Sequence, residues 1–156
     1  MRTKLRIFNS NVKAVLLYGC ETWRTTKGML QKIQTFYNTC LRRIYKICWT
    51  GKIRNEDLWE RAGQEPVAEQ ILRRKWGYIG HTLRKPTSST TYQALTWNPQ
   101  GKRKRGRPRS IRRRDTTAEL KWQGTNWSEI ERAAQNRVLW RDVVDGLCSY
   151  VGDGPK

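Results

Sequence analysis

KGMLQKIQTFYNTCLRRIYKIC, residues 27–48, is the stretch that decides the fold class. Its apolar side chains recur at intervals of three and four residues, the spacing of one face of an α-helix. The apolar set is Leu30, Ile33, Tyr37, Cys40, Leu41, Ile44 and Ile47. The basic residues fall largely on another face: Lys32, Arg42, Arg43 and Lys46. The stretch therefore predicts a long amphipathic helix with a cationic outer side.

Helical spacing continues on both sides of this stretch. A shorter helix that ends at Gly19 is predicted from Leu5, Phe8, Val12, Val15 or Leu16, with Tyr18 as a further candidate. Asn55 is a suitable N-cap for a helix over 56–62, which Gly63 can close in a left-handed conformation. Pro66 suits the first position of the next helix, predicted over about 67–84. The apolar side of that helix consists of Val67, Ile71, Leu72, Trp76, Ile79 and Leu83.

A final helix is predicted from a capping box formed by Asn126 and Glu129. Its apolar positions are Ile130, Ala134, Val138, Trp140 and Val144, and a further helix over about 111–122 can precede it. The predicted fold class is all-α, a small helical bundle of about five helices with a basic, flexible linker. Most of the eight tryptophans are expected to be buried in it.

The chain is predicted to have four parts. Residues 1–84 form a helical region. Residues 85–110 form a basic linker rich in Pro, Ser, Thr and Gly. Residues 111–149 form a C-terminal helical segment, and residues 150–156 a disordered tail.

The charge is large and uneven. The formal net charge is +19 over 156 residues. Residues 1–63 carry 13 basic and 4 acidic side chains, and residues 101–114 carry 9 basic and none acidic. Self-repulsion on this scale disfavours a compact state unless a polyanion screens it. The expected partner is therefore nucleic acid, and the charge alone fits an RNA–DNA hybrid, RNA or duplex DNA equally.

The densest charge lies in GKRKRGRPRSIRRR, residues 101–114, which we call the basic arm. Within it, Arg105-Gly106-Arg107-Pro108-Arg109 resembles the core of an AT-hook, in which arginines enter the narrow minor groove of A/T-rich duplex. A solvated arm that contacts phosphates without preference fits the same residues. The candidate contacts in the arm are Lys102, Arg103, Lys104, Arg105, Gly106, Arg107, Pro108, Arg109, Arg112, Arg113 and Arg114. Residues 102–105 also fit a nuclear import signal, a weak pattern on its own.

The helices predicted over 56–62 and 67–84 leave two interpretations open. They fit a helix-turn-helix that presents Arg73, Arg74 and Lys75 to DNA. They equally fit a helical hairpin inside a bundle. Trp76 and Tyr78 are candidates for base stacking, although aromatic residues at helical spacing are more often core.

Residues typical of other chemistries are missing from the sequence. Four cysteines form no CxxC pair, and the single histidine, His81, lies far from all of them, so no zinc site, metal or cofactor is expected. We find no P-loop, dinucleotide fingerprint or paired carboxylates, so no catalytic residues are assigned and no enzyme activity is expected. Neither a signal peptide nor a membrane span is predicted. The expected location is nucleus or cytoplasm, with reduced thiols.

Five segments carry a family resemblance. They are AVLLYGCETWRTT (14–26), LRRIYKICWTGKIRNEDLWERAG (41–63), LRRKWGYIGHTLRKP (72–86), GKRKRGRPR (101–109) and AAQNRVLWRDVVDGLCS (133–149). In this order they resemble the C-terminal thumb and post-thumb region of the reverse transcriptase of non-LTR, LINE-like retrotransposons. The resemblance covers nearly the whole chain.

The resemblance implies a helical, thumb-like region over 1–84 that grips a primer–template duplex or element RNA. Arg42, Arg43 and Lys46 would then lie along the nucleic-acid backbone. The palm, with its metal-binding aspartates, and the endonuclease domain are not in this sequence, so polymerase activity is not carried over. A missing palm domain is a possible protein partner.

Three hypotheses follow. The first is a non-catalytic nucleic-acid-binding fragment of a retrotransposon reverse transcriptase. The second is a free-standing nuclear DNA-binding module built on the helix-turn-helix-like pair and the AT-hook-like arm. The third is a relic without a selected function that folds poorly on its own.

Overall fold

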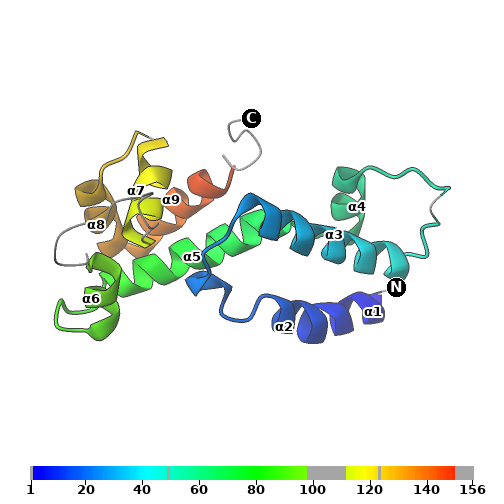
Figure 1. The fold of residues 1–156 in the computed structure, drawn as a ribbon, viewed down its shortest axis with the longest axis horizontal. Coiled ribbons are helices and arrows are strands. Elements are labelled where there is room, and N and C mark those ends of the chain that lie inside the picture. Colours follow the sequence, from blue (N-terminus) through cyan, green and yellow to red (C-terminus); the bar gives the residue numbers. More distant parts are fainter. Residues whose placement is uncertain (1, 49, 98–111, 123, 150–156) are drawn as a thin grey trace, which may run out of the picture. The chain divides into compact units, whose positions relative to one another are not determined.

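The computed structural model describes residues 2–48, 50–97, 112–122 and 124–149, and every regular element among them is a helix (Figure 1). The all-α prediction is therefore confirmed for this part of the chain. Two compact units divide the structure, Met1–Lys75 and Trp76–Tyr150. The boundary falls inside one helix, α5, which spans Val67–Leu83.

The first unit begins with a continuous helical run made of α1 (Arg2–Ile7), a π-helical segment (Phe8–Lys13) and α2 (Ala14–Leu16). Gly19 ends the run with a left-handed backbone at φ 65°, as the sequence predicts, and a single 3₁₀ turn follows at Cys20–Thr22. The run lies beside the next helix, since the rings of Phe8 and Tyr37 are 5.4 Å apart between centroids (Figure 1).

The apolar face predicted for this run is only partly right in its second half, because of the alternatives Val15 and Leu16 it is Leu16 that packs against the core. Val15 is 78% exposed and Tyr18 is 83% exposed, whereas Leu17 is fully buried. Val12 is also exposed. The cause is the π-helical segment, because each π turn holds more residues than an α turn and rotates the following positions out of α-helical register.

Helix α3 spans Lys27–Ile44 and buries Tyr37 and Leu41. The Thr26 side chain caps its start by accepting a hydrogen bond from the backbone N–H of Met29 at 3.3 Å. The helix ends at Ile44 and not at residue 48 as predicted. The residue responsible is Lys46, which adopts a left-handed φ of 53° that stops helix propagation.

A network of polar side chains joins α3 to the rest of the first unit. Buried Asn38 accepts hydrogen bonds from Gln34 Nε2 and from the Trp59 indole N–H, both at 2.8 Å. The Gln34 carbonyl oxygen accepts from the backbone N–H of Val67 at 2.8 Å. Because each of these groups is paired, the network fixes α3 against α4 (Asn55–Ala62) and the start of α5.

Helix α4 spans Asn55–Ala62 and is followed by Gly63 with a left-handed φ of 57°, which confirms the predicted helix end. The predicted N-cap is wrong. Asn55 is the first helical residue, and its side-chain oxygen accepts from Arg42 at 2.8 Å rather than from the start of its own helix.

Helix α5 confirms the predicted apolar face. Of the six predicted apolar positions, Leu72 is half-buried and the other five are buried: Val67, Ile71, Trp76, Ile79 and Leu83. Pro66 precedes the helix, and its carbonyl accepts from the backbone N–H of Gln70 at 3.2 Å.

The second unit contains four helices after α5: α6 (Thr90–Thr96), α7 (Arg112–Trp122), α8 (Trp127–Gln135) and α9 (Arg137–Ser149). The capping box of Asn126 and Glu129 is present at the start of α8. The predicted single C-terminal helix is interrupted at Asn136, which has an extended ψ of 116°. Its side-chain oxygen accepts from the backbone N–H of Val138 at 2.9 Å and so caps a new helix.

The prediction of about five helices is therefore too low for the described part of the chain. The break at Asn136 and the short helix α6, which lies inside the segment predicted as a linker, account for two additional helices. The helix considered over 111–122 is present as α7. The domain boundaries predicted at residues 84 and 110 stay a prediction, and the predicted tail lies outside the described residues.

The expectation that most tryptophans are buried is wrong for those that the structure describes. Trp76 and Trp140 are buried, with ring centroids 6.2 Å apart. The indole N–H of Trp140 donates to the Trp76 carbonyl at 3.2 Å. Trp97 is exposed, and the others are half-buried: Trp23, Trp59 and Trp127.

Candidate nucleic-acid interface

The three cationic residues predicted at the end of α3 have different surroundings. Arg43 and Lys46 are exposed. Arg42 is half-buried, and its guanidinium donates to Asn55 Oδ1 at 2.8 Å and to the Ile53 carbonyl at 3.3 Å. Arg42 therefore joins α3 to the start of α4, while Arg43 and Lys46 present charge to solvent.

The three cationic residues predicted on α5 also differ. The guanidinium of Arg73 forms an ion pair with Glu65 at 2.6 Å. Arg74 is exposed and donates to the Leu17 carbonyl at 3.1 Å, close to the end of the N-terminal helical run. Cations are favourable at that end of a helix because of its dipole. Lys75 is half-buried. Arg73 and Arg74 thus have structural partners within the first unit.

The helix pair α4 and α5 has the wrong charge for a helix-turn-helix. In that motif the first turns of the second helix contact base edges. In α5 those turns contain buried Val67 and Gln70 together with Glu69. Burial, and then the neighbouring carboxylate of Glu65, raise the pKa of Glu69. Carboxylates at this position repel phosphates, so the arrangement favours the interpretation as a helical hairpin.

Most of the basic arm lies outside the described residues. This holds for all candidate contacts from Lys102 to Arg109, including Gly106 and Pro108. Arg112, Arg113 and Arg114 are the first residues of α7. The AT-hook-like geometry therefore stays a prediction.

Sequence reasoning missed an exposed stripe on α3. Phe36 is 48% exposed and Met29 is 43% exposed, and the exposed cations Lys32 and Arg43 lie on the same side of the helix. The signal was available, because residues 29, 36 and 43 are spaced by seven and share one helix face. The prediction assigned apolar residues to a single buried stripe and so gave no role to these two.

A second missed residue is Lys13 in the N-terminal run. Its ammonium donates to Gln64 Oε1 at 2.9 Å, and the Tyr37 hydroxyl donates to the same oxygen at 2.6 Å. Burial, and then the like charge of Arg74, lower the pKa of Lys13. We interpret Lys13 as a structural cation that links the N-terminal run to the turn before α5.

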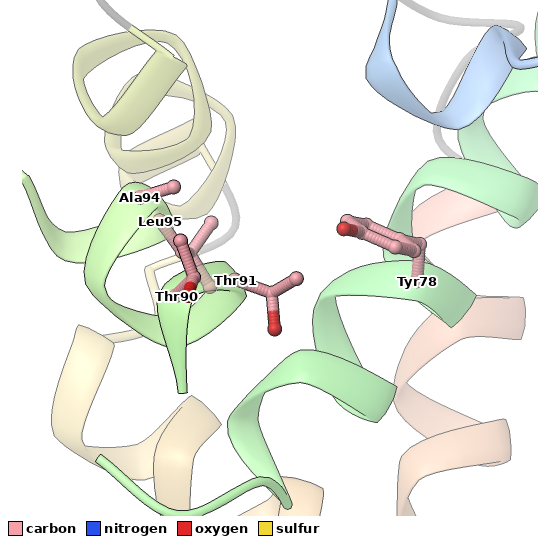
Figure 2. Close-up of a pocket in the computed structure, with 5 residues that line it drawn as sticks. All are labelled: Tyr78, Thr90, Thr91, Ala94 and Leu95. Carbon is pink, nitrogen blue, oxygen red and sulfur yellow. The ribbon is translucent and has the colours of Figure 1, made fainter. Parts of the chain in front are cut away.

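The second unit contains a small pocket between α5 and α6 (Figure 2). Its volume is about 170 Å³, and Tyr78 extends from α5 toward Thr90, Thr91, Ala94 and Leu95 of α6. Its described lining residues carry hydroxyl groups but neither a carboxylate nor a cation. It therefore offers no general base at neutral pH and no charge for a phosphate. Of the two candidate stacking residues, Trp76 is fully buried and Tyr78 lines this pocket.

The described residues offer neither a metal site nor a membrane-spanning helix. No group of three or more His, Cys, Asp or Glu side chains gathers there in a way that can hold a metal ion. No helix in the described ranges combines the length and apolarity that crossing a membrane requires. All four cysteines are free thiols.

Comparisons with known proteins give two similarities. Residues 1–18 match a family described as a domain of unknown function, DUF6451. A protein of Caenorhabditis elegans, named as an uncharacterized transposon-derived protein, is 26% identical over 154 residues. The aligned region covers 92% of this chain and 54% of that relative, so the chain spans about half the length of the relative. No solved structure matches the chain.

Proposed function

We propose that this chain is a non-catalytic, nucleic-acid-binding segment that originates from the reverse transcriptase of a transposon. The observation that carries the proposal is the net charge of +19, with nine of the cations in the basic arm. Similarity to a transposon-derived protein supports the origin. The resemblance to the thumb region of LINE-like elements supplies the finer assignment, with an RNA–DNA hybrid, RNA or duplex DNA as partner.

The proposed contacts fall into two groups. On the folded first unit, Arg43 and Lys46 are exposed and available to phosphates. In the basic arm, the lysines and arginines supply a dense cationic segment. Contacts of both kinds neutralise backbone charge without reading base sequence, and they position a duplex rather than select it.

Equilibrium titration of the whole chain tests the proposal. The ligands are an RNA–DNA hybrid, an A/T-rich duplex and a G/C-rich duplex of equal length, at one fixed salt concentration. Preference for the hybrid supports the reverse-transcriptase assignment, since A-form geometry offers a wide, shallow minor groove. Preference for the A/T-rich duplex supports instead the second candidate, a DNA-binding module that uses Arg105–Arg109 in a narrow minor groove. Absence of binding to all three ligands would contradict both.

A further inference from the structure

The exposed stripe of α3 combines large exposed apolar side chains with positive charges on one helix face. We define the stripe by Met29, Lys32, Phe36 and Arg43. Its two apolar members are nearly half exposed, although large apolar side chains on amphipathic helices normally face the core. The chain has two phenylalanines, and the other, Phe8, is buried against Tyr37. Phe36, by contrast, is 48% exposed.

The charge beside the ring is of one sign. Helix α3 contains no Asp or Glu between Lys27 and Ile44. With a rise of about 1.5 Å per residue, Lys32 lies about 6 Å before Phe36 along the axis, and Arg43 about 10 Å after it. An apolar ring between two exposed cations is complementary to a ligand that is flat, apolar on its faces and anionic along its edge.

A nucleic-acid strand with unpaired bases has that chemistry. Its bases present flat π-faces that stack on aromatic side chains, and its phosphates pair with Lys and Arg. In a duplex, each base is covered on both faces by its neighbours, so a ring fixed on a helix has no free face to stack on. The stripe therefore favours single strands over duplexes.

We propose that the exposed stripe of α3 binds single-stranded nucleic acid, with one base stacked on the Phe36 ring and phosphates held by Lys32 and Arg43. This inference rests on the proposed function and adds to it a strand-specific contact, separate from the phosphate contacts of the basic arm. Because Phe36 is 48% exposed and lies about 100° around the helix axis from buried Tyr37, its replacement changes the surface more than the core.

The test compares two matched ligands. One is an oligothymidylate of about 12 nucleotides, a length within the range that single-strand-binding domains occupy. The other is an abasic strand with the same number of phosphates. The ratio of the two dissociation constants measures the contribution of the bases, because the phosphate contribution is common to both. The variants are Phe36→Leu, which keeps apolar bulk but removes the π-face, and Phe36→Trp, which keeps a π-face.

We expect Phe36→Leu to reduce the preference for the thymidylate strand by roughly five- to a hundredfold, the range measured for one stacked base. Phe36→Trp should retain the preference, and binding of Phe36→Leu to a duplex should equal that of the wild type. A second variant pair, Lys32→Gln and Arg43→Gln, should weaken binding to both single strands and lower the salt dependence by about 0.7 unit of log–log slope each.

Three results would overturn the inference. One is an unchanged preference of Phe36→Leu for the thymidylate strand over the abasic strand. Another is an equal loss of affinity of Phe36→Leu for single strand and for duplex. The third is failure of Phe36→Trp to retain the preference although its thermal melting matches that of the wild type. These outcomes differ from failure of the proposed function, in which the wild-type chain binds neither strand nor duplex.

Discussion

At the scale of single residues, Gly80 is the described glycine at which an added side chain has the least room. A Cβ atom built on Gly80 would overlap the indole of Trp140, whose N–H donates to the carbonyl of Trp76. The absence of a side chain at residue 80 is therefore what allows α9 to approach α5 within the second unit.

We predict that Gly80→Ala lowers the free energy of unfolding by about 1–3 kcal/mol, the usual cost of overpacking a buried contact. Gly77→Ala, three residues earlier on the same helix, is the matched control. Gly77 is exposed and a Cβ there meets no atom within 4 Å, so alanine should stabilise by about 0.5–1 kcal/mol through helix propensity. Chemical denaturation measures both, and equal effects of the two substitutions would refute the packing argument.

Glu69 gives the first unit a pH dependence whose sign can be worked out. Burial, followed by the charge of Glu65, raises the pKa of Glu69 above its ordinary value. Between the ordinary and the raised pKa the folded state therefore holds a proton that the unfolded chain has released, and stability falls as pH rises through this window. Above the raised pKa the loss is complete and constant.

Glu69→Gln cannot ionise and should lack this decline. The free energy of unfolding of this variant minus that of the wild type should therefore be larger at pH 7 than at pH 4. Denaturation curves at both pH values measure the difference. Glu60→Gln, an exposed carboxylate on α4, controls for the loss of one charge. A Glu69→Gln difference that is the same at both pH values would contradict the burial of this carboxyl group.

At the scale of elements, the end of α3 is a Schellman motif with a lysine where glycine is usual. The N–H of Ile47 donates to the Arg42 carbonyl at 2.9 Å, and the N–H of Lys46 to the Arg43 carbonyl at 3.2 Å. Lys46 occupies the left-handed position of this motif, with φ 53°. A β-carbon in that conformation costs about 1 kcal/mol or more.

We predict that Lys46→Gly raises the free energy of unfolding by about 1 kcal/mol. Lys46→Ala removes the same charge but keeps the β-carbon, so it should give no such gain. Thermal or chemical unfolding of the two variants side by side is the measurement. If alanine stabilises as much as glycine, the effect comes from charge and not from backbone conformation.

The sequence predicted elements well where periodicity decides them. The apolar residues of α5 are buried as predicted because an uninterrupted period of 3.6 leaves one face to the core. Element ends and breaks were missed because single side chains set them. Lys46 stops α3 through its own φ, and Asn136 splits the C-terminal helix by capping α9. Helix α6 was missed because its Thr-rich sequence has low helix propensity and buried Leu95 holds it by tertiary contact.

The candidate site was predictable only in part. Charge density pointed to the basic arm, and helical periodicity together with the family resemblance pointed to the cations of α3. Which cations are free and which are structural could not be predicted, since the Arg42 contact to Asn55 and the Arg73 contact to Glu65 join residues from different elements. The exposed position of Phe36 likewise depends on which face of α3 the N-terminal run covers.

At the scale of the whole molecule, self-repulsion should dominate stability. With a net charge of +19, the folded chain is destabilised at low ionic strength, and salt screens this repulsion. We predict a Tm that rises as salt increases from about 10 mM to about 100 mM, over which the Debye length shortens from about 30 Å to about 10 Å. Circular dichroism melting measures it. Melting without cooperativity at all salt concentrations would favour the relic hypothesis, and a Tm independent of salt would contradict the repulsion argument.

The most direct test of nucleic-acid binding is the salt dependence of affinity for a duplex, measured for three proteins. They are the wild type, an arm variant with Ala at Arg103, Arg105, Arg107 and Arg109, and a control with Ala at the exposed residues Lys121, Arg132, Arg137 and Arg141. Both variants lose four positive charges. If the basic arm holds phosphates, its variant should lose up to about four units of log–log slope, at about 0.9 per contact, while the control keeps the wild-type slope. An arm variant with an unchanged slope, or a control with the same loss, would contradict the account.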